Sequence, residues 1–121
     1  MNIPFAAIDH VQLAMPKGEE ETARRFYRDM LGMTELQKPA ELAKRGGCWF
    51  ESGKVQIHLG IENDFHPAKK AHPALRCENY ATLIAHLQKQ AIDVIPDDAL
   101  PGTTRCYIHD PFGNRIELIA A

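Results

Sequence analysis

The chain has 121 residues, and its 14 Lys and Arg against 16 Asp and Glu give a formal net charge of −2. This length suits one domain, or two small modules that share a core. Because the sequence has no block of basic residues, it lacks the footprint of a nucleic-acid-binding protein. No apolar run approaches the roughly 20 residues that span a membrane, so we expect neither nucleic acid nor a membrane as partner.

The start of the chain, MNIPFAAIDH, has no basic segment followed by a long apolar one, and it predicts no signal peptide. The three cysteines, Cys48, Cys77 and Cys106, are odd in number and show no CxxC spacing. They indicate buried, reduced thiols rather than a disulfide framework or a zinc site. We therefore expect a cytoplasmic protein.

The first half of the chain shows the pattern of a strand, a helix and three further strands. Residues 8–15 alternate between apolar and polar, as in a half-buried strand. A helix should begin near residues 19–21 and end at Gly32, which suits a C-terminal cap. Its apolar stripe consists of Ala23, Phe26, Tyr27, Met30 and Leu31. This half ends with a short strand near residues 34–37, the polar linker KPAELAKRGG, and two further strands, CWFES and VQIHLGI. The turn SGK joins these two strands into a hairpin.

After the polar segment ENDFHPAKK the same order of elements returns. HPALRC predicts a strand, and Asn79 suits the N-cap of a helix whose apolar stripe is Tyr80, Leu83, Ile84 and Leu87. DVIPD predicts a short strand, and TRCYIHD and RIELIA a hairpin around the turn DPFGN. The 121 residues therefore predict a single domain of two repeats, at about residues 5–65 and about 69–121.

Four polar residues occupy matching places in the two repeats. His10 and His72, on the predicted first strands, lie 62 positions apart, and His58 and Glu117, on the last strands, lie 59 apart. Strand alternation places all four on the face opposite the helices. Three imidazoles and a carboxylate suit a divalent transition metal such as Ni²⁺, Zn²⁺, Fe²⁺ or Mn²⁺, whereas Ca²⁺ and Mg²⁺ prefer oxygen ligands.

Simpler interpretations exist for each of these residues. A single histidine on a half-buried strand is more often hydrogen-bonded within the structure than bound to a metal. Glu117 needs a cationic partner if it is buried, and Arg105 on the neighbouring hairpin strand is the alternative to a metal ion. The matching positions in two repeats favour the metal site, whereas Cys48 is expected in the core rather than as a nucleophile.

The run DHVQLAMPKGEEETARRFYRDMLGM resembles the opening of the vicinal oxygen chelate superfamily, and DPFGNRIEL is similar to its closing motif. That superfamily holds glyoxalase I, extradiol dioxygenases, fosfomycin-modifying enzymes and bleomycin-resistance proteins, and the match covers essentially the whole chain. The resemblance implies an α+β fold in which two βαβββ modules form an open mixed β-barrel with the helices on its outer face. It also implies metal ligands at His10, His58, His72 and Glu117, and a homodimer in which a site sometimes combines both chains.

Within this superfamily the sequence favours a metal-dependent, glyoxalase-like enzyme of lyase or isomerase type that chelates a small oxygenated substrate. Glu117 would be a ligand and the catalytic base, His10 and His72 ligands, and His58 a fourth ligand or a neighbour of the site. Candidate substrate-binding residues are Arg105, Arg115, Trp49, Tyr107 and Phe112. Two departures from glyoxalase I argue against a glutathione-dependent reaction: His58 stands where that enzyme carries glutamate, and no arginine follows His10 in the first strand. An Fe²⁺ extradiol-type dioxygenase and a metal-free drug- or metabolite-binding resistance protein are the alternatives.

Overall fold

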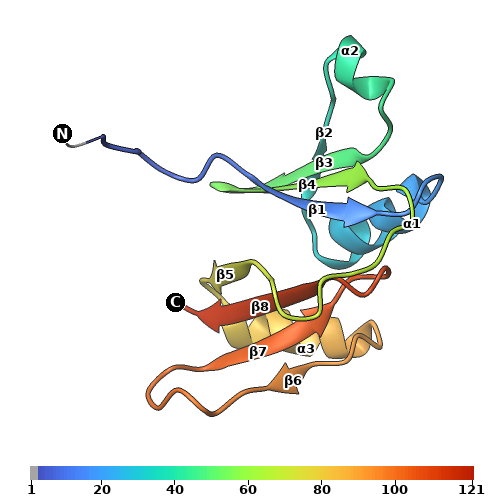
Figure 1. The fold of residues 1–121 in the computed structure, drawn as a ribbon. Coiled ribbons are helices and arrows are strands. Elements are labelled where there is room, and N and C mark those ends of the chain that lie inside the picture. The colour runs from blue at the N-terminus through green and yellow to red at the C-terminus, as the bar shows by residue number, and fades with distance from the viewer. Residues whose placement is uncertain (1–2) are drawn as a thin grey trace.

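A computed structural model describes residues 3–121 as two successive modules (Figure 1). The first contains β1 (Val11–Met15), α1 (Glu20–Arg24), which continues directly as the π-helical segment η1 (Arg25–Met30), β2 (Thr34–Leu36), α2 (Ala40–Ala43), β3 (Cys48–Ser52) and β4 (Val55–Ile61). The second contains β5 (Ala74–Cys77), α3 (Tyr80–Lys89), β6 (Ile95–Pro96), β7 (Arg105–His109) and β8 (Arg115–Ala120). No helix within residues 3–121 is both long and apolar enough to cross a membrane.

The two modules have the same sheet topology. The strand orders are β1-β4-β3-β2 and β5-β8-β7-β6, and in each the first strand pairs in parallel with the last. Parallel neighbours need a long crossover, which the helix provides, whereas the last two strands form an antiparallel hairpin. The predicted α+β arrangement of paired βαβββ modules is confirmed. Within residues 3–121 the two sheets stay separate and do not close into a barrel.

One short element departs from the predictions. The segment expected to be a polar linker contains the helix α2, which begins directly after Pro39. A four-residue helix has no apolar repeat that a sequence pattern could reveal. The linker is held against β4 at Gly47, which has a φ of 80°, and a side chain there would collide with the backbone oxygen of Leu59.

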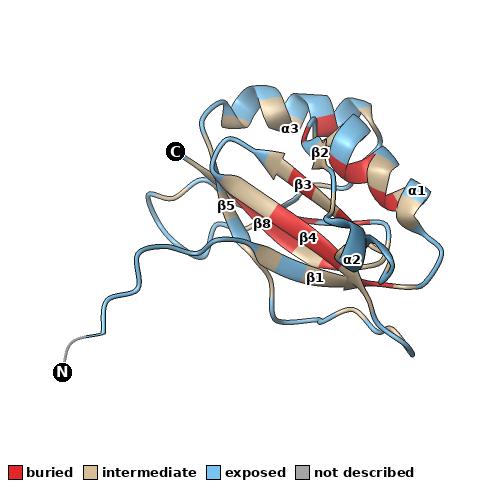
Figure 2. Cartoon of the chain, turned by 90° about the horizontal axis from the view of Figure 1, so that it is seen from above, coloured by how far each residue is buried: buried red, intermediate tan, exposed pale blue. Residues whose placement is uncertain are grey.

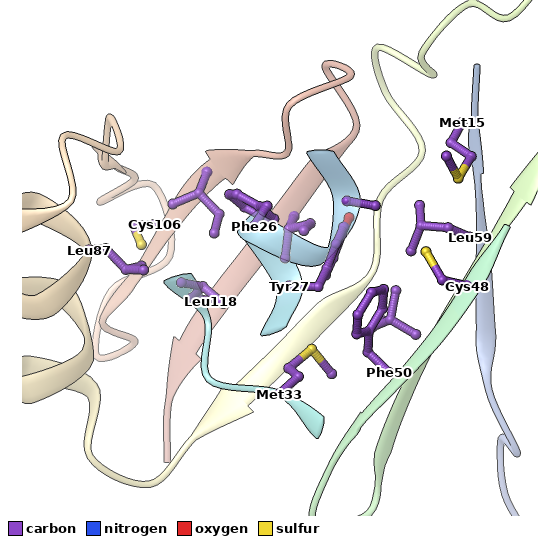
Figure 3. Close-up of a cluster of buried hydrophobic side chains, with 14 residues drawn as sticks. Met15, Phe26, Tyr27, Met33, Cys48, Phe50, Leu59, Leu87, Cys106 and Leu118 are labelled. Carbon is purple, nitrogen blue, oxygen red and sulfur yellow. The ribbon is translucent and has the colours of Figure 1, made fainter. Parts of the chain in front are cut away.

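A single hydrophobic core joins the two modules (Figure 3). The apolar faces of both sheets contribute to it, and the helices cover these faces from one side (Figure 2). Phe26 and Tyr27 of η1 lie between residues of the first sheet, such as Phe50, and residues of the second module, such as Leu118 (Figure 3). The faces that pack on the helices are therefore shared, and the opposite faces of the two sheets remain open.

The turn DPFGN links the modules through the buried side chain of Asp110, which is 5% exposed. The Tyr27 hydroxyl donates to Asp110 Oδ2 at 2.7 Å, and the backbone N–H groups of Phe112 and Asn114 donate to Oδ1 at 2.9 and 2.8 Å. Asn114 Nδ2 donates to Asp110 Oδ2 and to the Ala14 carbonyl of β1. Burial, followed by the Asp110 carboxylate, raises the pKa of Tyr27 well above its usual value, so the hydroxyl keeps its proton.

Replacing Tyr27 by phenylalanine should destabilise the protein by about 1–3 kcal/mol, because it leaves a buried carboxylate short of one donor. Urea unfolding at neutral pH measures the loss. The matched control is Thr22→Val on α1, which removes an exposed hydroxyl that donates to Glu19 and should change stability by less than about 0.5 kcal/mol. Equal effects of the two substitutions would show that the Tyr27–Asp110 contact does not hold the modules together.

Candidate functional site

The structure divides the four predicted metal ligands into two pairs. His10 and His58 belong to the first module, and His72 and Glu117 to the second. His10 lies one residue before β1 and His72 two residues before β5, so the prediction that both lie within strands is wrong by one or two positions. Among residues 3–121, no three His, Cys, Asp or Glu side chains converge on one point that could hold an ion. Ligation by all four residues therefore stays a prediction.

In the second module, His72 and Glu117 are in direct contact. His72 Nε2 lies 2.9 Å from Glu117 Oε1, and His72 Nδ1 lies 2.8 Å from the carbonyl oxygen of Lys70. A carbonyl and an ionised carboxylate can only accept hydrogen bonds. Nδ1 must therefore carry a proton, and a neutral imidazole would turn its Nε2 lone pair toward the negative carboxylate. The contact is favourable when His72 is an imidazolium, or when a cation lies between Nε2 and the carboxylate.

Glu117 also meets the arginine that the sequence offered as its alternative partner. Arg105 Nη1 lies 3.2 Å from Glu117 Oε2, Arg105 Nη2 lies 3.2 Å from Asp97 Oδ2, and Arg105 Nη1 also donates to the Tyr107 hydroxyl. The hydrogen bond from His72 and then that from Arg105 lower the pKa of Glu117, against the opposing effect of burial. Glu117, which is 7% exposed, is thus held ionised. The Nε of Arg105 is buried without a hydrogen-bond partner among the described residues.

In the first module, three rings form a stack. The His10 and His58 ring centroids lie 4.0 Å apart with an interplanar angle of 11°, and Trp49 covers the His58 ring at 4.2 Å and 11°. His10 Nδ1 contacts Asp9 Oδ1 at 2.9 Å, and His10 Nε2 has no hydrogen-bond partner among residues 3–121. Burial, followed by the neighbouring His10, lowers the pKa of His58 and favours its neutral form. An ion bound to an imidazole nitrogen lies near that ring's plane, so one ion cannot bind both rings in this stacked arrangement.

A pocket of about 520 Å³ lies beside this stack. Its polar lining includes both histidines, Trp49 and two cationic side chains, Lys38 and Arg45. Asp9 is the one acidic residue of the lining, and it contacts His10. The pocket therefore combines a free imidazole nitrogen, an aromatic wall and a net positive charge.

The structure places the remaining candidate residues as follows. Tyr107 packs edge-on against His72, with centroids 5.4 Å apart, and the Arg115 guanidinium lies over the Tyr107 ring at 3.8 Å. Phe112 instead packs edge-on against Phe65 and against the core.

Two acidic neighbours of the candidate ligands, Asp9 and Asp97, were not singled out in the sequence. Asp9 could have been suspected from its position next to His10. Asp97 follows the two-residue strand β6, which has no periodic pattern, so its contact with Arg105 had no signal in the sequence. Cys48 is buried as predicted, and burial raises its pKa to about 11, which argues against a nucleophilic role.

Replacing Glu117 by glutamine should destabilise the chelator-treated protein at pH 7 by about 1–3 kcal/mol, because His72 and Arg105 lose a charged partner. The folded-state pKa of Glu117 lies below its ordinary value of 4.5. The carboxylate therefore contributes stability above pH 4.5 and loses it as the pH falls through the lowered folded value. Urea unfolding of both proteins between pH 3 and 7 should show the difference shrinking in acid.

The matched control for this experiment is Glu62→Gln, because Glu62 is exposed and makes no ion pair within residues 3–121. It should change stability by less than about 0.5 kcal/mol at each pH. A difference between wild type and the Glu117 variant that stays constant down to pH 3 would contradict the assigned ionised state.

Comparison with known proteins agrees with this arrangement of elements. Residues 7–118 match the model of the Glyoxalase/Bleomycin resistance protein/Dioxygenase superfamily. A crystal structure of a glyoxalase family protein from Bacillus anthracis is 51% identical, with a TM-score of 0.96 over 99% of this chain and 98% of that one. Lactoylglutathione lyase from Agrobacterium tumefaciens shares the fold at 21% identity, with a TM-score of 0.71 over 98% and 96% of the two chains.

A fosfomycin resistance protein from Listeria monocytogenes also has this fold, at 12% identity and a TM-score of 0.73 over 98% and 95% of the two chains. A search of curated proteins found no match. The family model covers nearly the whole sequence, and the Bacillus anthracis structure extends the match over almost every residue. The chain therefore belongs to the Glyoxalase/Bleomycin resistance protein/Dioxygenase superfamily.

Proposed function

We propose that this chain is a metal-dependent, glyoxalase-like enzyme that acts on a small oxygenated substrate by lyase or isomerase chemistry. In this proposal it works as a homodimer. Each site combines His10 of one chain with His72 and Glu117 of the other. The three free cysteines fit a reducing compartment such as the cytoplasm.

The observation that carries the proposal is the contact between His72 and Glu117. The Lys70 carbonyl holds the proton of His72 on Nδ1, so Nε2 is the nitrogen that can bind a metal. Two ligands at about 2.0–2.2 Å from one ion lie about 2.8–3.1 Å apart at the 90° angle of an octahedral site and about 3.3–3.6 Å apart at the tetrahedral angle. The 2.9 Å between His72 Nε2 and Glu117 Oε1 fits the octahedral spacing. A divalent cation would add a further positive charge beside the Glu117 carboxylate, which Arg105 already contacts.

The set of ligands is completed most simply by His10. Its Nδ1 donates to a carboxylate, which leaves Nε2 available in the manner common for metal-binding histidines. His58 lies sandwiched between His10 and Trp49, so we assign it the role of orienting the His10 ring rather than binding the ion. Two imidazoles and a carboxylate suit Ni²⁺, Zn²⁺, Fe²⁺ or Mn²⁺.

Within such a site the chain's own residues have distinct tasks. The bound ion would act as a Lewis acid on two oxygens of the substrate. Arg105 holds Glu117 Oε2 in place and keeps the carboxylate ionised. Because Glu117 is ionised it can accept a proton from the substrate, and its lowered pKa makes it a weak base for that step. The pocket beside His10, at about 520 Å³, has the size of a small-molecule site.

The proposal includes a second chain because the two half-sites lie on different sheets of the same chain. Among residues 3–121 no three His, Cys, Asp or Glu side chains converge on one point, which supports a site completed by a partner chain. The arm before β1 also carries large apolar side chains in the open, with Phe5 91% and Ile8 80% exposed. This arm extends away from the body of the chain (Figure 2). Exposed apolar residues next to His10 favour burial against a partner.

Complementation between two inactive variants tests the shared site. The His10→Ala and Glu117→Ala proteins should each lose the metal as homodimers. A heterodimer of the two, coexpressed with different affinity tags, should regain one ion per dimer, half the wild-type content. Only a site that spans both chains predicts this recovery, because the heterodimer then combines an intact His10 with an intact His72 and Glu117. Elemental analysis of the purified proteins is the measurement.

His109→Ala is the matched control, since His109 is exposed and outside both pairs, and it should retain the wild-type metal content. A heterodimer without metal would place each site within one chain. The metal-dependent function would be contradicted if wild-type protein contained less than a tenth of an equivalent of transition metal and its melting temperature did not change on adding these ions. Such a protein would fit the alternative of a metal-free binding protein.

An Fe²⁺ dioxygenase is the second candidate, because two histidines and one carboxylate are the ligand set of many non-haem iron oxygenases. Protein loaded with Fe²⁺ without oxygen and then mixed with a catechol should consume oxygen if this reaction operates. An oxygen electrode measures the uptake, with Glu117→Ala as the inactive control. Uptake no faster than in that control, across a panel of catechols, would remove this candidate.

A further inference from the structure

The open face of the second sheet carries two arginines that differ in their contacts. Arg105 and Arg115 both lie on the same face as Glu117, because their strands alternate in the same register. Arg105 is 16% exposed at its side chain and is occupied by Glu117, Asp97 and Tyr107. No carboxylate within residues 3–121 lies within ion-pair distance of Arg115.

Arg115 is nevertheless held in a defined position. Its guanidinium lies 3.8 Å from the centre of the Tyr107 ring, which is close for a cation–π contact. Tyr107 is in turn 9% exposed and packs against His72. A guanidinium stacked through its flat face keeps its N–H edges available, and these edges match a carboxylate with two parallel hydrogen bonds. The stack thus prepares Arg115 to bind an anion.

The spacing relates this anion to the proposed reaction site. Arg115 precedes Glu117 by two residues on β8, so their Cα atoms are about 7 Å apart along the strand. A molecule whose oxygens are bound beside Glu117 could place a carboxylate on Arg115 through a spacer of two or three bonds. The pocket beside His10 adds Lys38 and Arg45 on the other half-site, and both cations favour a negatively charged ligand.

We propose that Arg115 is the residue that binds a carboxylate of the substrate, and that the substrate is therefore a small carboxylic acid whose two chelating oxygens are separate from that carboxylate. Arg105 serves as a positioning residue for Glu117 and does not contact the substrate. The inference rests on the proposed metal site for the place of the chelating oxygens. Its anion site depends on Arg115 and Tyr107 alone.

Two probes that differ only in the anionic end test this assignment. Succinic acid monohydroxamate offers a chelating hydroxamate and a carboxylate, and its amide replaces the carboxylate by a neutral group of the same shape. Calorimetric titration of Zn²⁺-loaded dimer should give a Kd about tenfold lower for the acid than for the amide. Arg115→Gln should abolish this preference with unchanged Zn²⁺ content, and Arg115→Lys should restore part of it.

Arg76→Gln is the matched control, because Arg76 lies on the same sheet, is exposed and makes no ion pair within residues 3–121. It should keep the preference for the acid. Three outcomes would overturn the inference: equal binding of acid and amide by wild type, no binding of either, or a preference that survives Arg115→Gln. In each case a measured Zn²⁺ content near one per site would still support the metal site. Protein that binds no Zn²⁺ but retains an Arg115-dependent preference for the acid would support the anion site and refute the metal-dependent function.

Discussion

The buried carboxylate of Asp110 is the contact on which both modules depend. It accepts hydrogen bonds from the helical segment of the first module and from the turn of the second. A buried carboxylate costs several kcal/mol unless hydrogen-bond donors surround it. The turn can therefore adopt few other conformations without losing the hydrogen bonds to Asp110. This turn also fixes the register of the hairpin, in which Tyr107 pairs with Glu117. The position of the candidate base therefore follows from a contact on the opposite side of the sheet.

Most of the elements could be predicted because each buries one face, and burial imposes a period on the sequence. The alternation in β4 and β8 places His58 and Glu117 on the faces away from the helices, as the pattern predicted. The same logic failed at the short helix α2, which has no period. It also placed His10 and His72 within strands, because an alternating pattern can continue past the last paired residue.

The relation between the two pairs of candidate ligands could not be predicted from the sequence. Alternation indicates which face a side chain occupies, but it contains no information on how two sheets face each other. That arrangement depends on the packing of η1 and α3 in a shared core, where Phe26 and Leu87 belong to one cluster. The ring stack of His10, His58 and Trp49 likewise depends on side-chain rotation. Glu117 meets Arg105, the partner that the sequence offered as the alternative to a metal ion, and also His72, a contact that the sequence did not predict.

The difference between the two repeats at their last strands has a consequence for symmetry. At the positions where β4 and β8 correspond, one repeat carries the neutral, stacked His58 and the other the ionised Glu117. If both repeats carried glutamate, a site built from one half of each chain would hold two carboxylates. These would repel each other or share one proton. With one of each, the proposed two-fold dimer would have a single carboxylate at every composite site. In that dimer, the divergence of the repeats would set the charge of each site without breaking the symmetry.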